Sequence, residues 1–214
     1  LNWKGEFLSA SAGNEVLALA REGVTYADVE GTGTTTLDDS WLEHHVAHVL
    51  DLDLVNAEAI RGAGLKVAVD AVNSSGGIAV PLLLQSLGVE VIQVHCEPTG
   101  DFAHNPEPLP EHLSDLTKTV IDSQCDFGIS VDPDVDRLCF VCEDGSFFGE
   151  EYTLVAVADY VLTHTPGPTV SNLSSTRALR EVSTHHGCAY TASAVGEVNV
   201  VAKMRETGAI LGGE

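Results

Sequence analysis

The stretch "DFGISVDPDVDRLCF" occupies residues 126–140 and decides how the surrounding chain folds. Its first part, 126–131, is a short and mostly apolar run, which predicts a buried β-strand. Three aspartates then follow at alternate positions, Asp132, Asp134 and Asp136. Pro133 cannot donate to a β-ladder, so the strand ends before it. The aspartates therefore fall in a loop at the carboxyl end of a strand, where open α/β sheets place their ligands.

The chain before this stretch alternates between strand-like and helix-like segments. We expect strands at 65–72 and 89–95, and helices at 76–88 and 110–124, with Pro110 opening the second helix. Strand and helix in regular alternation predict a parallel sheet with helices packed on it. Nearer the amino terminus, the pattern predicts helices at 9–23 and 40–50, joined by a polar, Gly/Thr-rich linker.

A second α/β cycle follows the stretch. Residues 137–149 predict a β-hairpin that turns at Glu143-Asp144-Gly145. The later segments alternate again, with helices expected at 150–164, 174–187 and 196–208 and strands at 167–173, 188–193 and 209–213. The predicted fold class is therefore α/β, with two consecutive mixed-sheet domains at 40–147 and 148–214. Residues 1–39 are interpreted as the remnant of a preceding domain and a linker.

Composition excludes several classes of partner. The chain has 32 acidic and 10 basic residues and a formal net charge of −22. Phosphate backbones bind Lys and Arg, so we expect no nucleic-acid partner. No apolar run approaches the roughly 20 residues of a membrane span, and the start lacks a signal-peptide pattern, so we expect no membrane partner. Five scattered cysteines indicate reduced thiols and a cytoplasmic protein.

The aspartate cluster predicts a Mg²⁺ site. A straight strand holds alternate side chains about 6.6 Å apart, so a curled loop is needed to gather three carboxylates around one ion. The plain alternative is a solvated acidic turn. An EF-hand would need Gly where Arg137 stands, and we reject it. A phosphatase of the haloacid dehalogenase type, with Asp132 as nucleophile, also begins with a strand and Asp-x-Asp, although there a helix normally follows.

Further motifs accompany the aspartates. In chain order they are "KVAVDAVNSSGG" (66–77), "GVEVI" (88–92), "HNPEP" (104–108), "DGSFFGEEYTLVAVADYVL" (144–162) and "VGEVNVVAKM" (195–204). With "DPDVDR" (132–137), they resemble the second and third domains of the α-D-phosphohexomutases, whose metal loop usually reads Asp-Gly-Asp-x-Asp-Arg. "GGE" (212–214) resembles the opening of the family's sugar-recognition loop. Among these enzymes the chain most resembles the bacterial phosphoglucosamine mutases.

The resemblance implies a reaction and its residues. These enzymes donate a phosphoryl group from a phosphoserine to a hexose phosphate, form a hexose bisphosphate, and take back the other phosphate. Carried over, the Mg²⁺ ligands are Asp132, Asp134 and Asp136, and Arg137 binds phosphoryl oxygens. Glu197 corresponds to a catalytic-centre loop. The expected substrate-binding residues are Arg137, Ser174, Ser175, Gly213 and Glu214. Each has a plainer reading: a surface ion pair for Arg137, and helix or strand ends for the others.

The resemblance also implies missing parts. The only Met is Met204, and the last strand-like run stops at Glu214, so we expect a piece of a longer protein. The family's serine would lie just before this chain, and the phosphate-binding fourth domain after it. The chain alone should then be inactive, and its partners are domains one and four of the same protein. Phosphomannomutase or phosphoglucomutase specificity, the Asp-nucleophile phosphatase and a non-catalytic metal- or partner-binding module stay open.

Overall fold

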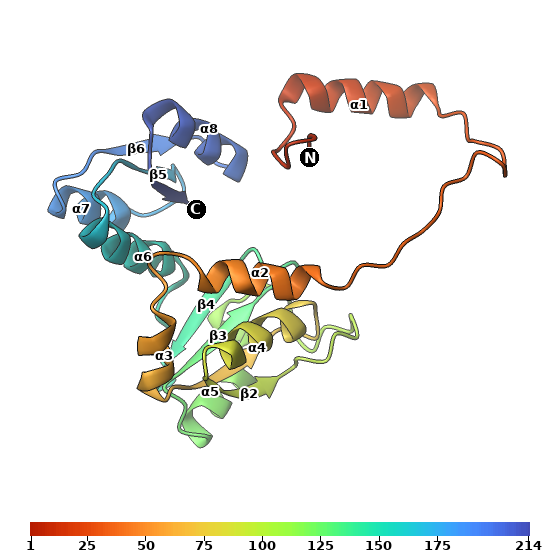
Figure 1. The fold of residues 1–214 in the computed structure, drawn as a ribbon. Helices are drawn as coiled ribbons and strands as arrows, with labels where there is room; N and C mark the ends of the chain where they lie inside the picture. Colours follow the sequence, from red (N-terminus) through yellow and green to blue (C-terminus); the bar gives the residue numbers. More distant parts are fainter. The chain divides into compact units, whose positions relative to one another are not determined.

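A computed structural model describes residues 1–214, with the side chain of Glu150 outside the description. Internal contacts divide the chain into two units, Leu1–Asp39 and Ser40–Glu214. The first unit contains helix α1, Ala10–Glu22, at the red end of the chain in Figure 1. Ser9 caps this helix because its Oγ accepts the N–H of Ala12 at 3.2 Å. The helix predicted at 9–23 is therefore confirmed.

The first part of the second unit is built on a four-stranded sheet of order β2-β1-β3-β4. Its strands are β1 (Lys66–Asp70), β2 (Glu90–Val94), β3 (Phe127–Val131) and β4 (Leu138–Cys142). β2, β1 and β3 are parallel, and β4 returns antiparallel to β3. In this register Asp70 lies opposite Ser130, so the loops that follow β1 and β3 leave the sheet at the same edge.

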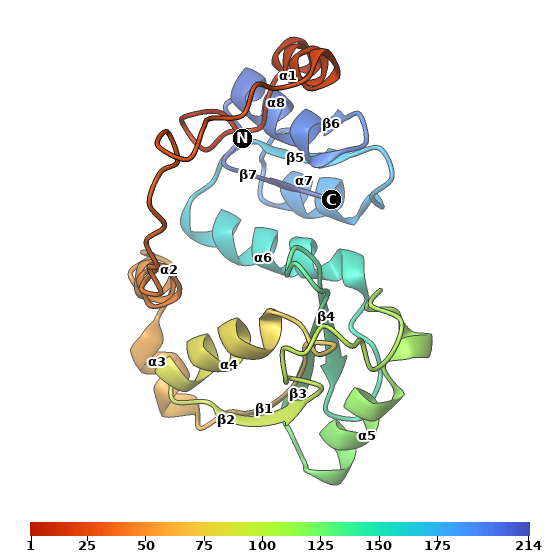
Figure 2. The same cartoon turned by 90° about the vertical axis from the view of Figure 1, so that its right-hand side faces the viewer.

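Helices cover both faces of this sheet (Figure 2). On β1, Val67 and Val69 belong to a core shared with α4 (Gly76–Ser86), against which residues of α2 (Trp41–Leu50) and α3 (Ala57–Ala63) also pack. Ala68, between those two valines, belongs to the opposite core, with Leu116 of α5 (Ser114–Asp122). This alternation is the two-residue period of a strand that is buried on both sides.

The rest of the unit forms a three-stranded parallel sheet of order β6-β5-β7. Its elements are α6 (Glu150–His164), β5 (Thr169–Asn172), α7 (Ala178–His185), β6 (Tyr190–Ser193), α8 (Glu197–Thr207) and β7 (Leu211–Gly213). Gly212 faces Met204 of α8 and Gly213 faces Leu154 of α6, which puts these helices on opposite faces. The first sheet is mixed, whereas the three strands of the second are all parallel.

Some elements differ from their predictions. The helix expected at 110–124 is split into a 3₁₀ turn, η1 (Pro110–His112), and α5, because the fully buried Leu113 has φ −107° and ψ 29°. The hairpin return is a single bridge between Val141 and Phe147. Helix α3 was not predicted, since its seven residues are too few for a periodic signal. Within the described residues, no helix combines the length and apolarity needed to cross a membrane.

A close backbone approach fixes the first turn of α4. A Cβ atom at Gly77 would lie 2.1 Å from the carbonyl oxygen of Cys96, which follows β2. Contacts of this length do not occur, so the position admits glycine alone without a shift of the backbone. The same β1–α4 loop carries Ser74 and Ser75, whose hydroxyls hydrogen-bond to the loop that follows β3.

We expect Gly77→Ala to lower the free energy of unfolding by about 2–3 kcal/mol, because the added methyl group meets rigid backbone. Gly62→Ala is the matched control, since a Cβ at this helical position meets nothing within 4 Å. It should raise stability by about 0.5–1 kcal/mol, as is usual for glycine to alanine in a helix. Urea unfolding of both variants measures the difference, and equal effects would contradict the proposed clash.

Candidate functional site

The three aspartates of the β3–β4 loop converge in space. Asp132, Asp134 and Asp136 each offer one carboxylate oxygen, and these oxygens lie within 4.8 Å of one another. Oxygens on opposite sides of one Mg²⁺ lie about 4.2 Å apart, and oxygen ligands are those that this ion prefers. Asp132 is buried and the other two are exposed, so an ion would reach the cluster from solvent. The residues present therefore fit a small divalent cation.

Asp132 itself organises the loop. Its Oδ1 accepts the backbone N–H groups of Asp136 and Arg137, each at 3.1 Å, and its carbonyl accepts the N–H of Val135 at 3.2 Å. Val135 adopts φ +63°, a left-handed conformation that costs a β-branched residue about 1–2 kcal/mol. The loop thus curls around the side chain of its first aspartate and turns the later carboxylates back toward it.

The β1–α4 loop ties this curl to the sheet. Ser74 Oγ donates to the carbonyl oxygen of Pro133 at 2.5 Å, and Ser75 Oγ donates to the same oxygen at 2.9 Å. The hydroxyls of both serines therefore hold the backbone between Asp132 and Asp134 and support the acidic loop.

Arg137 extends from the acidic loop to a neighbouring loop. Its Nη1 donates a hydrogen bond to Glu107 Oε2, and its Nε lies 4.0 Å from Asp132 Oδ2. The hydrogen bond to Glu107 is the largest cause that raises the pKa of the Arg137 guanidinium, followed by the charge of Glu107 and those of Asp132 and Asp136. The guanidinium is about half exposed and can be reached by an anion.

Asn172 shapes the corresponding edge of the second sheet. This residue ends β5 and is 2% exposed. Its Oδ1 accepts four contacts of 2.8–3.0 Å, from the backbone N–H and the hydroxyl of both Ser174 and Ser175. Because these serines form a turn, α7 begins at Ala178 rather than at the predicted residue 174. The turn presents two hydroxyl-bearing residues at the carboxyl end of the sheet.

The remaining predicted residues lie at this same edge. Glu214, just after β7, accepts the backbone N–H of Gly196 at 2.7 Å, and Glu197 begins α8 directly after that glycine. Ser175 and Glu214 also line one small hollow. The structure thus brings the loops after β5, β6 and β7 together, as it brings Asp132, Asp134, Asp136 and Arg137 together on the first sheet.

A larger hollow, of about 490 Å³, lies elsewhere and is lined by residues of β3, β4 and α6. Its walls are mostly apolar, with Phe127, Phe140 and Phe148 among them. An anionic sugar requires convergent polar and charged groups, which the two loop edges offer and these aromatic walls do not. We therefore place the candidate site at the edges.

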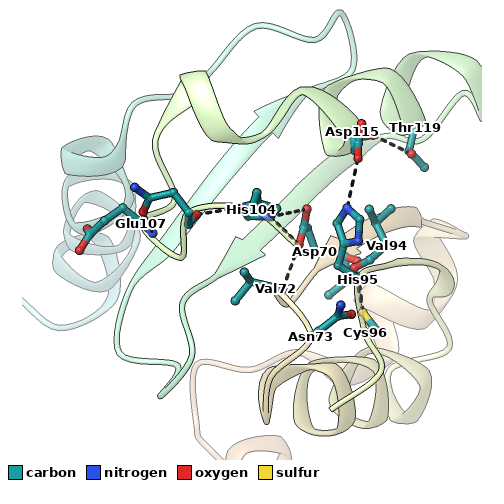
Figure 3. Close-up of polar contacts among 12 residues, drawn as sticks. Asp70, Val72, Asn73, Val94, His95, Cys96, His104, Glu107, Asp115 and Thr119 are labelled. Carbon is teal, nitrogen blue, oxygen red and sulfur yellow. Dashed lines mark hydrogen bonds and ion pairs between the residues drawn. The ribbon is translucent and has the colours of Figure 1, made fainter. Parts of the chain in front are cut away.

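Sequence reasoning missed a contact between the buried Asp70 and the partly buried His104 (Figure 3). Asp70 ends β1, and both of its carboxylate oxygens lie 3.2 Å from His104 Nε2. Asp70 Oδ1 also accepts the N–H of Val72, which has φ +48°. The available signal was the acidic residue that follows the apolar run 67–69, because a buried carboxylate needs a partner. His104 lies 34 residues away, so only the fold shows the pairing.

The fold and the site define a class of protein: tandem α/β/α layers, the first with an acidic loop suited to a divalent cation. Residues 43–145 match "Phosphoglucomutase/phosphomannomutase, alpha/beta/alpha domain II", and residues 149–214 match "alpha/beta/alpha domain III" of the same family. The chain belongs to this phosphohexomutase family.

Individual relatives agree with this assignment. A probable phosphoglucosamine mutase of Methanopyrus kandleri is 32% identical over 212 residues, which are 98% of this chain and 46% of that protein. A phosphoglucomutase of Neisseria gonorrhoeae is 32% identical over 98% of this chain and 45% of its own length. The crystal structure of a phosphoglucomutase/phosphomannomutase family protein from Burkholderia thailandensis superposes with a TM-score of 0.72 at 30% identity, over 86% of this chain and 39% of that one. This chain spans less than half the length of each.

We expect Asp134→Asn to weaken Mg²⁺ binding at least tenfold, because it removes one charged oxygen ligand from a three-ligand cluster. Asp122→Asn is the control: it changes the net charge equally at an exposed position that ends α5, outside the cluster. Isothermal titration with MgCl₂ gives both affinities. Undiminished binding in Asp134→Asn would remove the aspartate cluster from the metal site.

We expect Asn172→Ala to lower the free energy of unfolding by about 1–2 kcal/mol, because it removes the buried oxygen that accepts the hydrogen bonds of the Ser174–Ser175 turn. Asn172→Asp keeps an acceptor oxygen in place and should lose less. Urea unfolding compares the two variants. An equal loss in both would mean that the hydrogen bonds do not hold the turn.

Proposed function

We propose that this chain supplies the metal loop and the sugar-recognition edge of an enzyme that moves a phosphoryl group between O6 and O1 of a hexose phosphate. The donor is a phosphoserine outside these 214 residues, and a hexose bisphosphate is the intermediate. The observation that carries the proposal is the convergence of Asp132, Asp134 and Asp136, with Arg137 directly after them, at the carboxyl ends of the parallel strands β1 and β3.

The acidic loop would hold Mg²⁺ through its three aspartates. When bound, this ion offsets negative charge that develops on a transferring phosphoryl group. The chain's own contribution is to keep the carboxylates close together before the ion arrives. Asp132 does so by accepting hydrogen bonds from the backbone N–H groups of 136 and 137. The hydroxyls of Ser74 and Ser75 donate to the carbonyl oxygen of Pro133 and fix its position.

Arg137 would bind the phosphoryl oxygens. A guanidinium is always charged and offers a planar fork of donors that matches phosphate geometry. Its main-chain N–H is anchored on Asp132, so the side chain starts beside the metal ligands. This arrangement would put one permanent positive charge next to the bound cation in a chain whose net charge is −22.

The edge of the second sheet would recognise the sugar. The carboxylate of Glu214 can accept hydrogen bonds from two hydroxyl groups, and Gly213, directly before it, would contact sugar hydroxyls through its backbone. Ser174 and Ser175 offer hydroxyls at the same edge. Glu197, at the first position of α8, is the candidate acid or base for the sugar hydroxyl that receives or releases the phosphoryl group.

We assign residues 1–39 to the end of domain 1 and its linker, 40–147 to domain 2, and 148–214 to domain 3. Domains 1 and 4 of the same protein would be its partners and would complete the active centre in the cytoplasm. Glucosamine phosphate is the preferred substrate, and the name of the Methanopyrus kandleri relative supports this choice. The Neisseria gonorrhoeae relative is named a phosphoglucomutase, so glucose phosphate is the first alternative to test.

The test is made in the longer protein, with the flanking domains restored. We expect interconversion of glucosamine 6-phosphate and glucosamine 1-phosphate, dependent on Mg²⁺ and on catalytic glucose 1,6-bisphosphate. Arg137→Gln should lower kcat/KM by at least 100-fold, whereas Arg21→Gln in α1 should leave it unchanged. A coupled assay for each product, run in parallel with glucose and mannose phosphates, identifies the substrate.

Other results would select another function. Release of inorganic phosphate without isomer exchange would favour a phosphatase with Asp132 as nucleophile. No activity on any hexose phosphate would favour a metal- or partner-binding module. The 214-residue chain by itself should not turn over, and turnover by it would contradict the assignment of the phosphoserine to another segment.

A further inference from the structure

The loop between β2 and α5 links a buried carboxylate to the acidic loop. At one end, the side chain of Asp70 is 0% exposed and that of His104 is 15% exposed, and the two form an ion pair (Figure 3). A charge taken out of water is costly unless it is paired, so this contact holds His104 firmly against the end of β1. The pair is therefore an anchor for the residues that follow His104.

The fixed position of His104 also constrains the residues that follow it. Its Nδ1 lies 2.8 Å from the carbonyl oxygen of Asn105, and its Nε2 faces Asp70. The two ring nitrogens thus each lie against an oxygen atom, one on β1 and one on the next residue of the loop. Asn105 Oδ1 in turn accepts the N–H of Glu107 at 3.0 Å. The backbone of 104–107 is thus set by the buried pair.

Glu107 is the end of this chain of contacts and meets Arg137. Asp70–His104–Asn105–Glu107–Arg137–Asp132 is a continuous series of polar contacts that joins the ends of β1 and β3. Arg137 follows three carboxylates in sequence, yet its guanidinium hydrogen-bonds to a carboxylate on another loop. Glu107 is consequently the group with which an anion must compete for this arginine.

We propose that Glu107, set in place by the buried Asp70–His104 pair, is a positioning residue that holds Arg137 at rest and is displaced when a phosphoryl group binds. The proposal rests on the role given above to Arg137. Both side chains are about half exposed, at 53% and 50%. Exposed ion pairs are worth little, so a dianionic phosphate next to a metal ion can replace this one. The contact keeps the guanidinium directed and partly neutralised until then.

The experiment follows the Nε–H NMR signal of Arg137 in the 214-residue chain, saturated with Mg²⁺, during titration with glucose 1,6-bisphosphate. Glu107→Gln should move this signal before any ligand is added and lower the apparent Kd about two- to fivefold. Glu111→Gln is the matched control, four residues along the same segment and exposed. This control removes the same charge, and it should change the apparent Kd by less than half as much as Glu107→Gln does.

His104 is tested by rescue. His104→Ala should shift the Arg137 signal in the same direction as Glu107→Gln, because Glu107 loses its anchor. His104→Gln keeps a donor toward Asp70 and should restore the wild-type signal. In the longer enzyme, Glu107→Gln should lower KM without raising kcat. If His104→Ala fails to fold, the two glutamate variants still decide the matter.

Three outcomes would overturn the proposal. An Arg137 signal that is the same in the wild type and Glu107→Gln would mean that the contact does not persist in solution. An unchanged or weaker affinity in Glu107→Gln, or an equal gain in Glu111→Gln, would show that Glu107 does not compete for Arg137. These readouts do not depend on turnover, so absence of mutase activity in the longer protein would reject the proposed function separately.

Discussion

Hydrogen bonding between parallel strands is the constraint on which both loop edges depend. Because β1 and β3 run in the same direction with Asp70 opposite Ser130, the loops after them must leave the sheet side by side. The same holds for the loops after β5, β6 and β7 in the second sheet. The chemistry-bearing residues are therefore gathered by strand direction, although they are far apart in the sequence.

The loops after β1 and β3 have the same local backbone arrangement. Each begins with a buried aspartate whose Oδ1 accepts a backbone N–H further along, and each contains a valine with positive φ, Val72 or Val135. Left-handed valine is strained, and strain of this kind persists only where surrounding contacts over-determine the backbone. Here the aspartate side chains supply those contacts, so each carboxylate shapes the backbone of its own loop, while Asp70 also contacts His104 and Asp132 belongs to the aspartate cluster.

The order of strands and helices could be predicted from the sequence, because the alternation of buried strands and helices is a local pattern. The sequence was also enough to predict convergence of Asp132, Asp134 and Asp136, because Pro133 excludes a straight strand. It could not show how the convergence is held, because Ser74 and Ser75 lie almost 60 residues from their partner Pro133. For the same reason Glu107 and His104 were read only as parts of a motif. Contacts between loops depend on strand register, which no local pattern contains.

The net charge of −22 does not prevent a phosphate site at this edge. Charges more than about 10 Å away are largely screened at 0.1 M salt, so the nearest groups decide. Around the acidic loop those groups include backbone N–H donors, one guanidinium and the cation that the carboxylates would hold. In the proposed role, Glu107 would set how much of the guanidinium charge is available, so that a protein of strongly acidic composition would still present a local site for an anion.

The contacts of the acidic loop also determine where proline can stand in it. Pro133 is compatible because the loop uses its carbonyl oxygen, which takes the two serine hydroxyls, and requires no N–H there. Positions 135, 136 and 137 each donate an N–H to Asp132, so a proline at any of them would remove a bond that shapes the curl. The sequences that can form a loop of this shape are thus limited by the backbone donors as much as by the metal ligands. A search for similar loops in other sequences can therefore use both the permitted and the forbidden positions of proline.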